Sequence, residues 1–280
     1  MILINRRALA LIGATAAAIG STALISAPAQ AAAAGTVRTV GASQVQFIAA
    51  AGQANGVTIT VAGKVVTIDD KVALKAGTGC KAVAGDKTRV TCTLTGNLAS
   101  LNVKLGDKND WVKNKTTAKL AASGSAGNDT LYGGRANDTL YGGAGADKIY
   151  GGAGDDEITA GAGNDKVWGQ AGGDFIMAGA GNDVVSAGAG LDAVLGWSGN
   201  DTLLGGAGHD LLIGESINDD YTASGSAKAK DKIFGGTGID LGLALKGAKY
   251  SGVEAKTYQK WINLLEKSGV SSLSGIAKLG

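Results

Sequence analysis

Histidine is almost absent from this chain of 280 residues, and its absence excludes several classes of enzyme. The only histidine is His209, whereas a zinc protease of the H-E-x-x-H type needs two histidines one helical turn apart. The sequence also contains no G-x-S-x-G nucleophile elbow and no Walker-type lysine loop. We therefore expect a protein that is not an enzyme, in which His209 is a solvent-facing turn residue.

Charge is absent from a long stretch near the start of the chain. Residues 8–25 form an apolar run without a charged side chain, directly after two arginines. Ala29 and Ala31 then offer a small-residue cleavage site, so residues 1–31 are predicted to be the signal peptide of a secreted, extracellular protein. The run is rich in Ala and Gly rather than strongly hydrophobic, so we expect no membrane span in the mature chain.

Neither sign of charge is in excess. The chain has 26 Lys and Arg residues against 24 Asp and Glu residues. Removal of residues 1–31 takes away two arginines and no acid, which leaves 24 against 24. A neutral chain without a basic stripe argues against nucleic acid and anionic membranes as partners.

Cysteine is also scarce, with only Cys80 and Cys92 in the chain. The residues between them are typical of a β-hairpin that turns near Gly85 and Asp86. In an exported protein a disulfide between the two strands of such a hairpin is the natural pairing. We therefore predict a Cys80–Cys92 disulfide bond.

Glycine, by contrast, is abundant, with 47 residues, and it combines with aspartate in a unit of nine residues. Ten units follow one another without a gap from Gly124 to Ile213. Position six is Asp in all ten, position eight is Leu, Ile or Val, and position four is Gly in every unit except at Ala136. A flexible glycine linker has no reason to keep an acid and an aliphatic residue in register. The units read GSAGNDTLY, GGRANDTLY, GGAGADKIY, GGAGDDEIT, AGAGNDKVW, GQAGGDFIM, AGAGNDVVS, AGAGLDAVL, GWSGNDTLL and GGAGHDLLI.

This unit resembles the repeats-in-toxin (RTX) nonapeptide of hemolysin-type calcium-binding proteins. The resemblance covers Gly124 to Leu243 and implies an all-β fold, a parallel β-roll in which each unit supplies one turn and one short strand. Two units complete a coil, so residues eighteen apart stack in neighbouring coils. The family also implies calcium ions enclosed by aspartates of successive coils and carbonyl oxygens of the glycine-rich turns.

The residues themselves favour the same fold. In a three-residue strand such as Lys148 to Tyr150, the middle side chain points to one face and its neighbours to the other. Stacking then buries the position-eight residues as a thin apolar spine, which a single repeat could not do. The glycines permit positive φ and close backbone approach in the turns. The predicted spine consists of Leu131, Leu140, Ile149, Ile158, Val167, Ile176, Val185, Val194, Leu203 and Leu212.

The position-six aspartates present a charge problem. Stacking places them in two columns at roughly the 4.8 Å inter-strand spacing, where neighbouring charges repel by about 3 kcal/mol at an effective dielectric of about 20. A cation between them would remove this cost, and calcium is a hard ion that carboxylate and carbonyl oxygens satisfy. In this arrangement Asp129 lies at the edge of the array. The predicted calcium ligands are Asp129, Asp138, Asp147, Asp156, Asp165, Asp174, Asp183, Asp192, Asp201 and Asp210.

The array has a distinct region on each side. Residues 36–122 lack the unit and read as a small β domain that covers the first edge of the roll, with a hairpin at Val57–Ile68 and a degenerate turn ending in Asp110. This layout resembles calcium-binding proteins secreted by high-GC Gram-positive bacteria. We assign residues 123–243 to the roll and residues 244–280 to a C-terminal capping segment.

The repeat decays after Ile213 and resumes weakly, so calcium at Asp219, Asp231 or Asp240 is left open. The apolar spacing within residues 256–267 predicts a short helix. We expect Tyr258, Trp261, Ile262 and Leu265 of this helix to cover an outward apolar patch on late strands of one sheet, with a dimer interface as the alternative. The patch consists of Phe175, Met177, Ala193, Leu195, Leu211 and Ile213.

A binding module of a different class is the alternative function. Tyr132, Tyr150 and Trp168 occupy position nine in alternate units, so they should stack as an aromatic ladder on one face. Such a ladder could bind cell-wall or other extracellular polysaccharide and hold the protein at a cell surface. Aromatic packing that only stabilises neighbouring strands is the other interpretation.

Overall fold

The computed structural model describes residues 34–214 in full and the backbone of three further strands at 232–237, 241–243 and 249–251. All the regular structure in these residues is β-strand, and they contain no helix that could cross a membrane. The strands are β1 (Gly35–Val40), β2 (Gln44–Ile48), β3 (Gly56–Ala62), β4 (Val65–Asp69), β5 (Leu74–Ala76), β6 (Cys80–Val83), β7 (Asp86–Thr93), β8 (Ser100–Asp107), β9 (Trp111–Asn114), β10 (Lys119–Ala126), β11 (Thr130–Gly134) and β12 (Thr139–Ala144). The chain continues with β13 (Lys148–Ala153), β14 (Glu157–Ala162), β15 (Lys166–Ala171), β16 (Phe175–Ala180), β17 (Val184–Gly190), β18 (Ala193–Ser198), β19 (Thr202–Gly208), β20 (Leu211–Ile213), β21 (Lys232–Thr237), β22 (Leu241–Leu243) and β23 (Lys249–Ser251).

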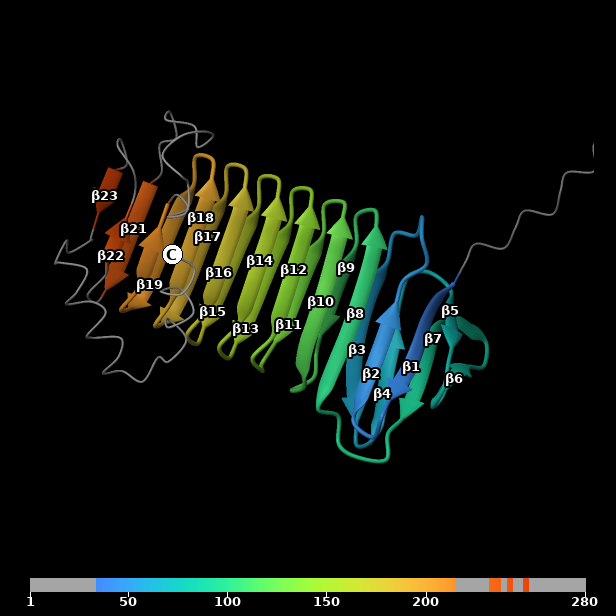
Figure 1. Cartoon of the computed structure of the whole chain (residues 1–280). Helices are drawn as coiled ribbons and strands as arrows, with labels where there is room; N and C mark the ends of the chain where they lie inside the picture. Colours follow the sequence, from blue (N-terminus) through green and yellow to red (C-terminus); the bar gives the residue numbers. More distant parts are fainter. Residues whose placement is uncertain (1–33, 215–231, 238–240, 244–248, 252–280) are drawn as a thin grey trace, which may run out of the picture. The chain divides into compact units, whose positions relative to one another are not determined.

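The strands form two sheets, one of 11 and one of 12 strands. From β8 onward the chain alternates between them, so that even-numbered strands pair in one sheet and odd-numbered strands in the other, as Figure 1 shows. Every pair in this part is parallel, and within the repeats partners are eighteen residues apart, as in Leu131 with Ile149. The predicted parallel β-roll is confirmed.

The position-eight spine is the core of the roll. All ten of its residues are 0% exposed, and the residues on either side of each point outward. Each unit therefore contributes one large buried aliphatic side chain, joined in three units by a buried alanine at position one, and the core is a thin layer between the two sheets. Such a thin core explains why repeats must stack before any of them is stable.

The turns require glycine because the coils approach each other through their backbones. Gly163, at position four of its unit, has a φ of +139°, and a Cβ there would collide with the carbonyl oxygen of Gly145 in the previous coil. At position two, Gln170 and Trp197 replace glycine and keep its positive φ, with values of 84° and 68°. Positions two and four both bring the backbones of neighbouring coils close together, since a Cβ at Gly143 would likewise collide with the Ser125 carbonyl oxygen.

The first seven strands form an N-terminal cap that extends both sheets of the roll. Hairpins β1–β2 and β3–β4 are antiparallel, and β2 and β3 join the roll by parallel pairing to β8 and β9. The hairpin predicted from the β-branched runs at 57–68 is confirmed. Unlike the roll, the cap is filled by large side chains, including Phe47, Ile59 and Ile68.

Parallel stacking begins before the first strict repeat. Strand β8 pairs with β10, and β9 with β11, in parallel. Partners are nineteen residues apart here, as in Trp111 with Thr130, so the first coil is one residue longer than those that follow. The region assigned to the β domain, 36–122, therefore contains three strands of the roll.

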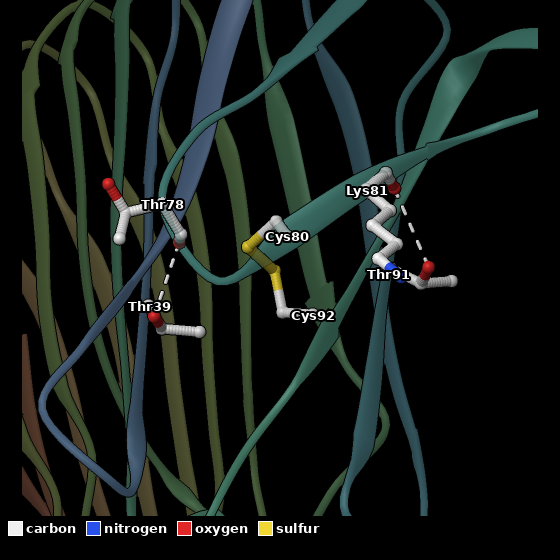
Figure 2. The surroundings of a disulfide bond; sticks show 6 residues. All are labelled: Thr39, Thr78, Cys80, Lys81, Thr91 and Cys92. Atoms are coloured by element: carbon white, nitrogen blue, oxygen red, sulfur yellow. Dashed lines mark hydrogen bonds between the residues drawn. A yellow bond between two sulfur atoms is a disulfide. The ribbon is translucent and has the colours of Figure 1, made fainter.

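The predicted disulfide between Cys80 and Cys92 is present and joins β6 to β7 (Figure 2). Cys80 lies opposite Cys92 in the antiparallel register, and the chain turns between them at Gly85, whose φ is +79°. The bond anchors β6, which is the edge strand of its sheet. A covalently held edge strand is less available for pairing with another chain.

Beyond the repeats, β21 and β22 resume the roll in register with β19 and β20. Strand β23 pairs with β21 and lies past residue 243, where the roll was expected to end. The three acids at 219, 231 and 240 and the helix predicted within 256–267 lie outside the described residues. On β20, Leu211 and Ile213 of the apolar patch are 7% and 4% exposed.

Candidate metal centre

The ten position-six aspartates are all buried, each with 2% or less of its surface exposed. Each lies directly before a strand of the roll, and in the first eight, Asp129 to Asp192, the backbone N–H donates to the Oδ1 of the aspartate eighteen residues later. Asp129 N donates to Asp147 Oδ1 at 2.7 Å, and Asp147 N donates to Asp165 Oδ1 at 2.7 Å. These bonds define the two predicted columns, one of which runs through Asp129, Asp147, Asp165, Asp183 and Asp201 and the other through Asp138, Asp156, Asp174, Asp192 and Asp210.

The second carboxylate oxygen has no such donor in most of the array. A buried acceptor without a hydrogen-bond partner costs about 1–3 kcal/mol, and more when it is charged. Repeating that cost along both columns would make the roll unstable unless something outside the chain satisfies these atoms. Within the described residues, the Oδ2 atom lacks a partner in Asp129, Asp138, Asp147, Asp156, Asp165, Asp174, Asp183 and Asp192.

In five of these units the orphaned oxygen lies beside a backbone carbonyl. A Cβ added to Gly124 would collide with Asp129 Oδ2 and lie 2.6 Å from the Gly142 carbonyl oxygen, so both oxygens border one small space. Two oxygens that share a space without a hydrogen between them repel each other. The same arrangement recurs around Gly133, Gly142, Gly151 and Gly169.

Burial, rather than mutual repulsion, is the larger electrostatic effect. The pKa of Asp147 is raised from 3.8 to about 7, chiefly by loss of hydration and to a lesser extent by the neighbouring charges of Asp129 and Asp165. Burial likewise raises the pKa of Asp174 to about 7 and of Asp183 to about 6. The sequence argument invoked repulsion between columns of acids, but removal of the carboxylates from water contributes more.

The carboxylate and carbonyl oxygens at these positions fit a hard cation as ligands. No group of three or more His, Cys, Asp or Glu side chains that could hold a metal comes together in the described part of the chain, so backbone carbonyls must complete any coordination shell. Calcium accepts six to eight oxygen ligands in flexible geometry, drawn from both carboxylates and carbonyls. A cation beside Asp129 Oδ2 and the Gly142 carbonyl would convert a repulsive pair of oxygens into a pair of ligands.

Sequence reasoning treated position five as variable and missed a second ladder there. Ala146 N donates to Asn128 Oδ1, and Gly173 N donates to Asp155 Oδ1, both at 2.8 Å. This acceptor lies in the earlier coil, whereas the position-six acceptor lies in the later one, so the two ladders run in opposite directions. The available signal was Asn in half of the units, at Asn128, Asn137, Asn164, Asn182 and Asn200.

Three polar residues that precede the repeats were also missed. Asp70, Asp110 and Asn55 are each 4% exposed or less, and each has a side-chain oxygen without a hydrogen-bond partner among the described residues. Asp110 N donates to Asp129 Oδ1 at 2.8 Å, so Asp110 extends the first column. The expectation that Asp129 lies at the edge of the array is therefore wrong, because the degenerate turn before β9 keeps the register of the roll.

The aromatic ladder is present, and its rings stack on one another along one sheet. Tyr132 and Tyr150 stack with centroids 4.7 Å apart and planes 6° apart, and Tyr150 and Trp168 stack at 4.5 Å and 4°. The outer face of Tyr132 is covered by the Lys113 ammonium, 5.2 Å from the ring centroid. A sugar ring stacks on an exposed aromatic face, so this geometry favours strand-stabilising packing over polysaccharide binding.

Comparison with known families agrees with the geometry. A family model of the RTX calcium-binding nonapeptide repeat matches the chain in four overlapping copies, at residues 123–158, 150–185, 168–203 and 177–212. Residues 123–212 are therefore similar to RTX calcium-binding repeats, and such repeats imply calcium binding. A search of curated proteins found no match to the chain. The cap and the residues after 212 lie outside the matched region.

Proposed function

We propose that this chain is a secreted, non-catalytic calcium-binding protein whose roll folds around calcium ions held between its coils. The observation that carries the proposal is the repeated pairing of a buried, orphaned carboxylate oxygen with a backbone carbonyl, as at Asp129 and Gly142. A buried charge that lacks a partner is among the most costly features a protein can contain. A metal that binds only the folded roll adds its binding free energy to folding.

The proposal that the protein is exported rests on residues 1–31 and on the disulfide. A disulfide is typical of oxidising compartments, and calcium is plentiful outside cells and scarce in the cytosol. A roll that needs calcium would therefore fold only after export. Expression of the full chain in a secreting bacterium, followed by N-terminal sequencing of protein from the medium, should find a mature start after Ala31.

Non-catalytic function is proposed from the chemistry available in the sequence. The only histidine, His209, lies in a turn of the roll, and the carboxylates that cluster are those of the columns. The narrower resemblance to calcium-binding proteins of high-GC Gram-positive bacteria also stays a prediction.

Circular dichroism of the chain during a calcium titration tests the central part of the proposal. In chelator the β-sheet signal should be that of the cap alone, and calcium should restore the signal of the roll. Magnesium, titrated in the same way, should be a poor substitute because it demands a smaller octahedral site. A full β-sheet signal in excess chelator at neutral pH, or equal effects of the two metals, would contradict the proposal.

A further inference from the structure

Each position along a column of stacked side chains is called a rung here. One rung lies in the cap, at Asn55, and it has the geometry of the aspartate array but carries an amide in place of a carboxylate. Asn55 precedes β3 as Asp110 precedes β9 and Asp129 precedes β11, and the strand registers place these three residues in one column. Their hydrogen bonds follow the same rule, since Asn55 N donates to Asp110 Oδ1 and Asp110 N donates to Asp129 Oδ1. The column that begins in the repeats therefore ends at Asn55.

The Asn55 amide meets the backbone carbonyl that corresponds to the one beside each orphaned carboxylate oxygen in the repeats. In the array this is the carbonyl of position one in the next coil, such as Gly142 beside Asp129. The registers of β8, β10 and β12 align Leu105 with Gly124 and Gly142. Asn55 Nδ2 donates to the Leu105 carbonyl at 3.3 Å, so an N–H group stands where the array presents a bare carboxylate oxygen.

The orientation of this amide follows from its neighbours. Asn55 Nδ2 also donates to the Gln53 carbonyl, at 3.2 Å. Both neighbours are carbonyl oxygens, which can only accept, so the nitrogen and not the oxygen must face them. Asn55 is 0% exposed, so water does not compete for these bonds. The amide thus supplies, within the chain itself, a hydrogen-bond donor to the carbonyl that lies beside a bare carboxylate oxygen in the repeats.

Asp110 lies in the column between Asn55 and the first aspartate of the repeats. It is 3% exposed, its Oδ1 accepts from Asn55 N, and its Oδ2 has no hydrogen-bond partner in the described residues. The register places the Gly124 carbonyl beside it, as the Gly142 carbonyl lies beside Asp129. Asp110 nonetheless lies outside the residues that the repeat family matches, 123–212.

We propose that this column of cation sites extends one rung beyond the nonapeptide repeats, to an ion bound between Asp110 and Asp129, and ends there because the Asn55 amide replaces the next ion. The proposal rests on the calcium function proposed above and adds a site to it. The other column ends differently, since its first position is held by Leu120, whose N–H donates to Asp138 Oδ1. Only one column therefore gains a site in the cap.

Native mass spectrometry of the full chain in calcium can count bound ions one by one, and two opposite substitutions test the proposal. Asp110→Asn should lower the count by one without loss of β-sheet signal, because the new amide can donate to the Gly124 carbonyl. Asn55→Asp should raise the count by one and make the cap sensitive to chelator. The control is Asp107→Asn, which removes a carboxylate that accepts from Gly52 N outside the column, and it should leave the count unchanged.

The outcomes separate this inference from the function on which it rests. If the unmodified chain binds no calcium, the proposed function fails and this site with it. If the chain binds calcium but Asp110→Asn keeps the same count, only the additional site is wrong. Misfolding of Asp110→Asn in saturating calcium would also overturn the inference, since the amide is expected to replace the ion there.

Discussion

The cap and the repeats share the same two sheets, yet they hold themselves together by different means. In the cap, large side chains such as Phe47 and Ile59 fill the interior, a disulfide joins β6 to β7, and Arg89 pairs with Asp69 at 2.6 Å. In the repeats, each unit buries one aliphatic residue and one carboxylate. The cap contains its own partners for most of what it buries, whereas the roll needs partners from solution.

If the roll folds around calcium as proposed above, one β-sheet is metal-independent at one end and metal-dependent at the other. The backbone pairing is continuous from β3 through β9 to β11, so hydrogen bonding between strands does not make the difference. The difference lies in one atom per rung, a donor nitrogen in Asn55 and a bare oxygen in Asp129. The predictions below test the comparison.

The largest effect should come from pH, because it acts on both columns at once. Burial raises the pKa of Asp147, Asp156 and Asp174 from 3.8 to about 7, so the folded roll binds more protons than the unfolded chain between these values. The metal-free roll should therefore be most stable below about pH 4 and lose stability as the pH rises through 7. Unfolding by urea in chelator, at a series of pH values, measures this change.

Calcium should reverse the direction of that dependence. Protonated carboxyls do not bind calcium, so the calcium-loaded roll should lose stability as the pH falls from 7 toward 5. Opposite slopes in calcium and in chelator are the expected result. Parallel slopes would mean that the aspartate columns are not the calcium ligands.

An aspartate should matter far more in the roll than in the cap. Asp165→Ala removes a group that lies between two neighbouring rungs. It should raise the calcium concentration at the midpoint of folding at least about tenfold. Asp69→Ala breaks an ion pair in which both side chains are more than a third exposed, and it should cost under about 1 kcal/mol with an unchanged midpoint. Calcium titrations and thermal unfolding of both variants give the comparison, which fails if the two midpoints move equally.

A glycine should likewise matter more where coils meet. In the roll, a Cβ at Gly163 would collide with the Gly145 carbonyl, whereas at Gly63 in the β3–β4 hairpin, with a φ of +59°, nothing lies within 4 Å. Gly163→Ala should therefore cost roughly 3 kcal/mol and Gly63→Ala about 1 kcal/mol. Denaturant unfolding in calcium measures both, and equal costs would show that positive φ alone, rather than contact between coils, makes the glycine necessary.

The smallest effect should come from the aromatic stack. Tyr150 contacts rings on both of its faces, so Tyr150→Ala should cost about 1 kcal/mol more than Tyr141→Ala, which removes an outward tyrosine of the other sheet. Thermal unfolding in calcium is the measurement. A polysaccharide that binds the chain and is lost in Tyr150→Ala, with stability unchanged, would restore the alternative function.

The repeat made most of the roll predictable from the sequence. A strict period of nine determines both the register of the strands and which side chains point into the core. The spine and the two columns follow directly from residues such as Ile149 and Asp147. The position of Asp110 in the column was not predicted because its coil is one residue longer than the period of the repeat. The position of Asn55 was not predicted because pairing between β3 and β9 brings it to the column from far away in the sequence. Ring orientation in the stack depends on side-chain rotamers, which a repeat pattern does not specify.

Amide hydrogen exchange along the whole chain, in calcium and in chelator at neutral pH, tests the central claim most directly. Residues 35–93 should be equally protected in both conditions, because the cap contains its own hydrogen-bond partners. Residues 130–213 should be protected in calcium and exchange rapidly in chelator. Protection of the repeats in excess chelator, or loss of protection in cap and repeats together, would contradict the account.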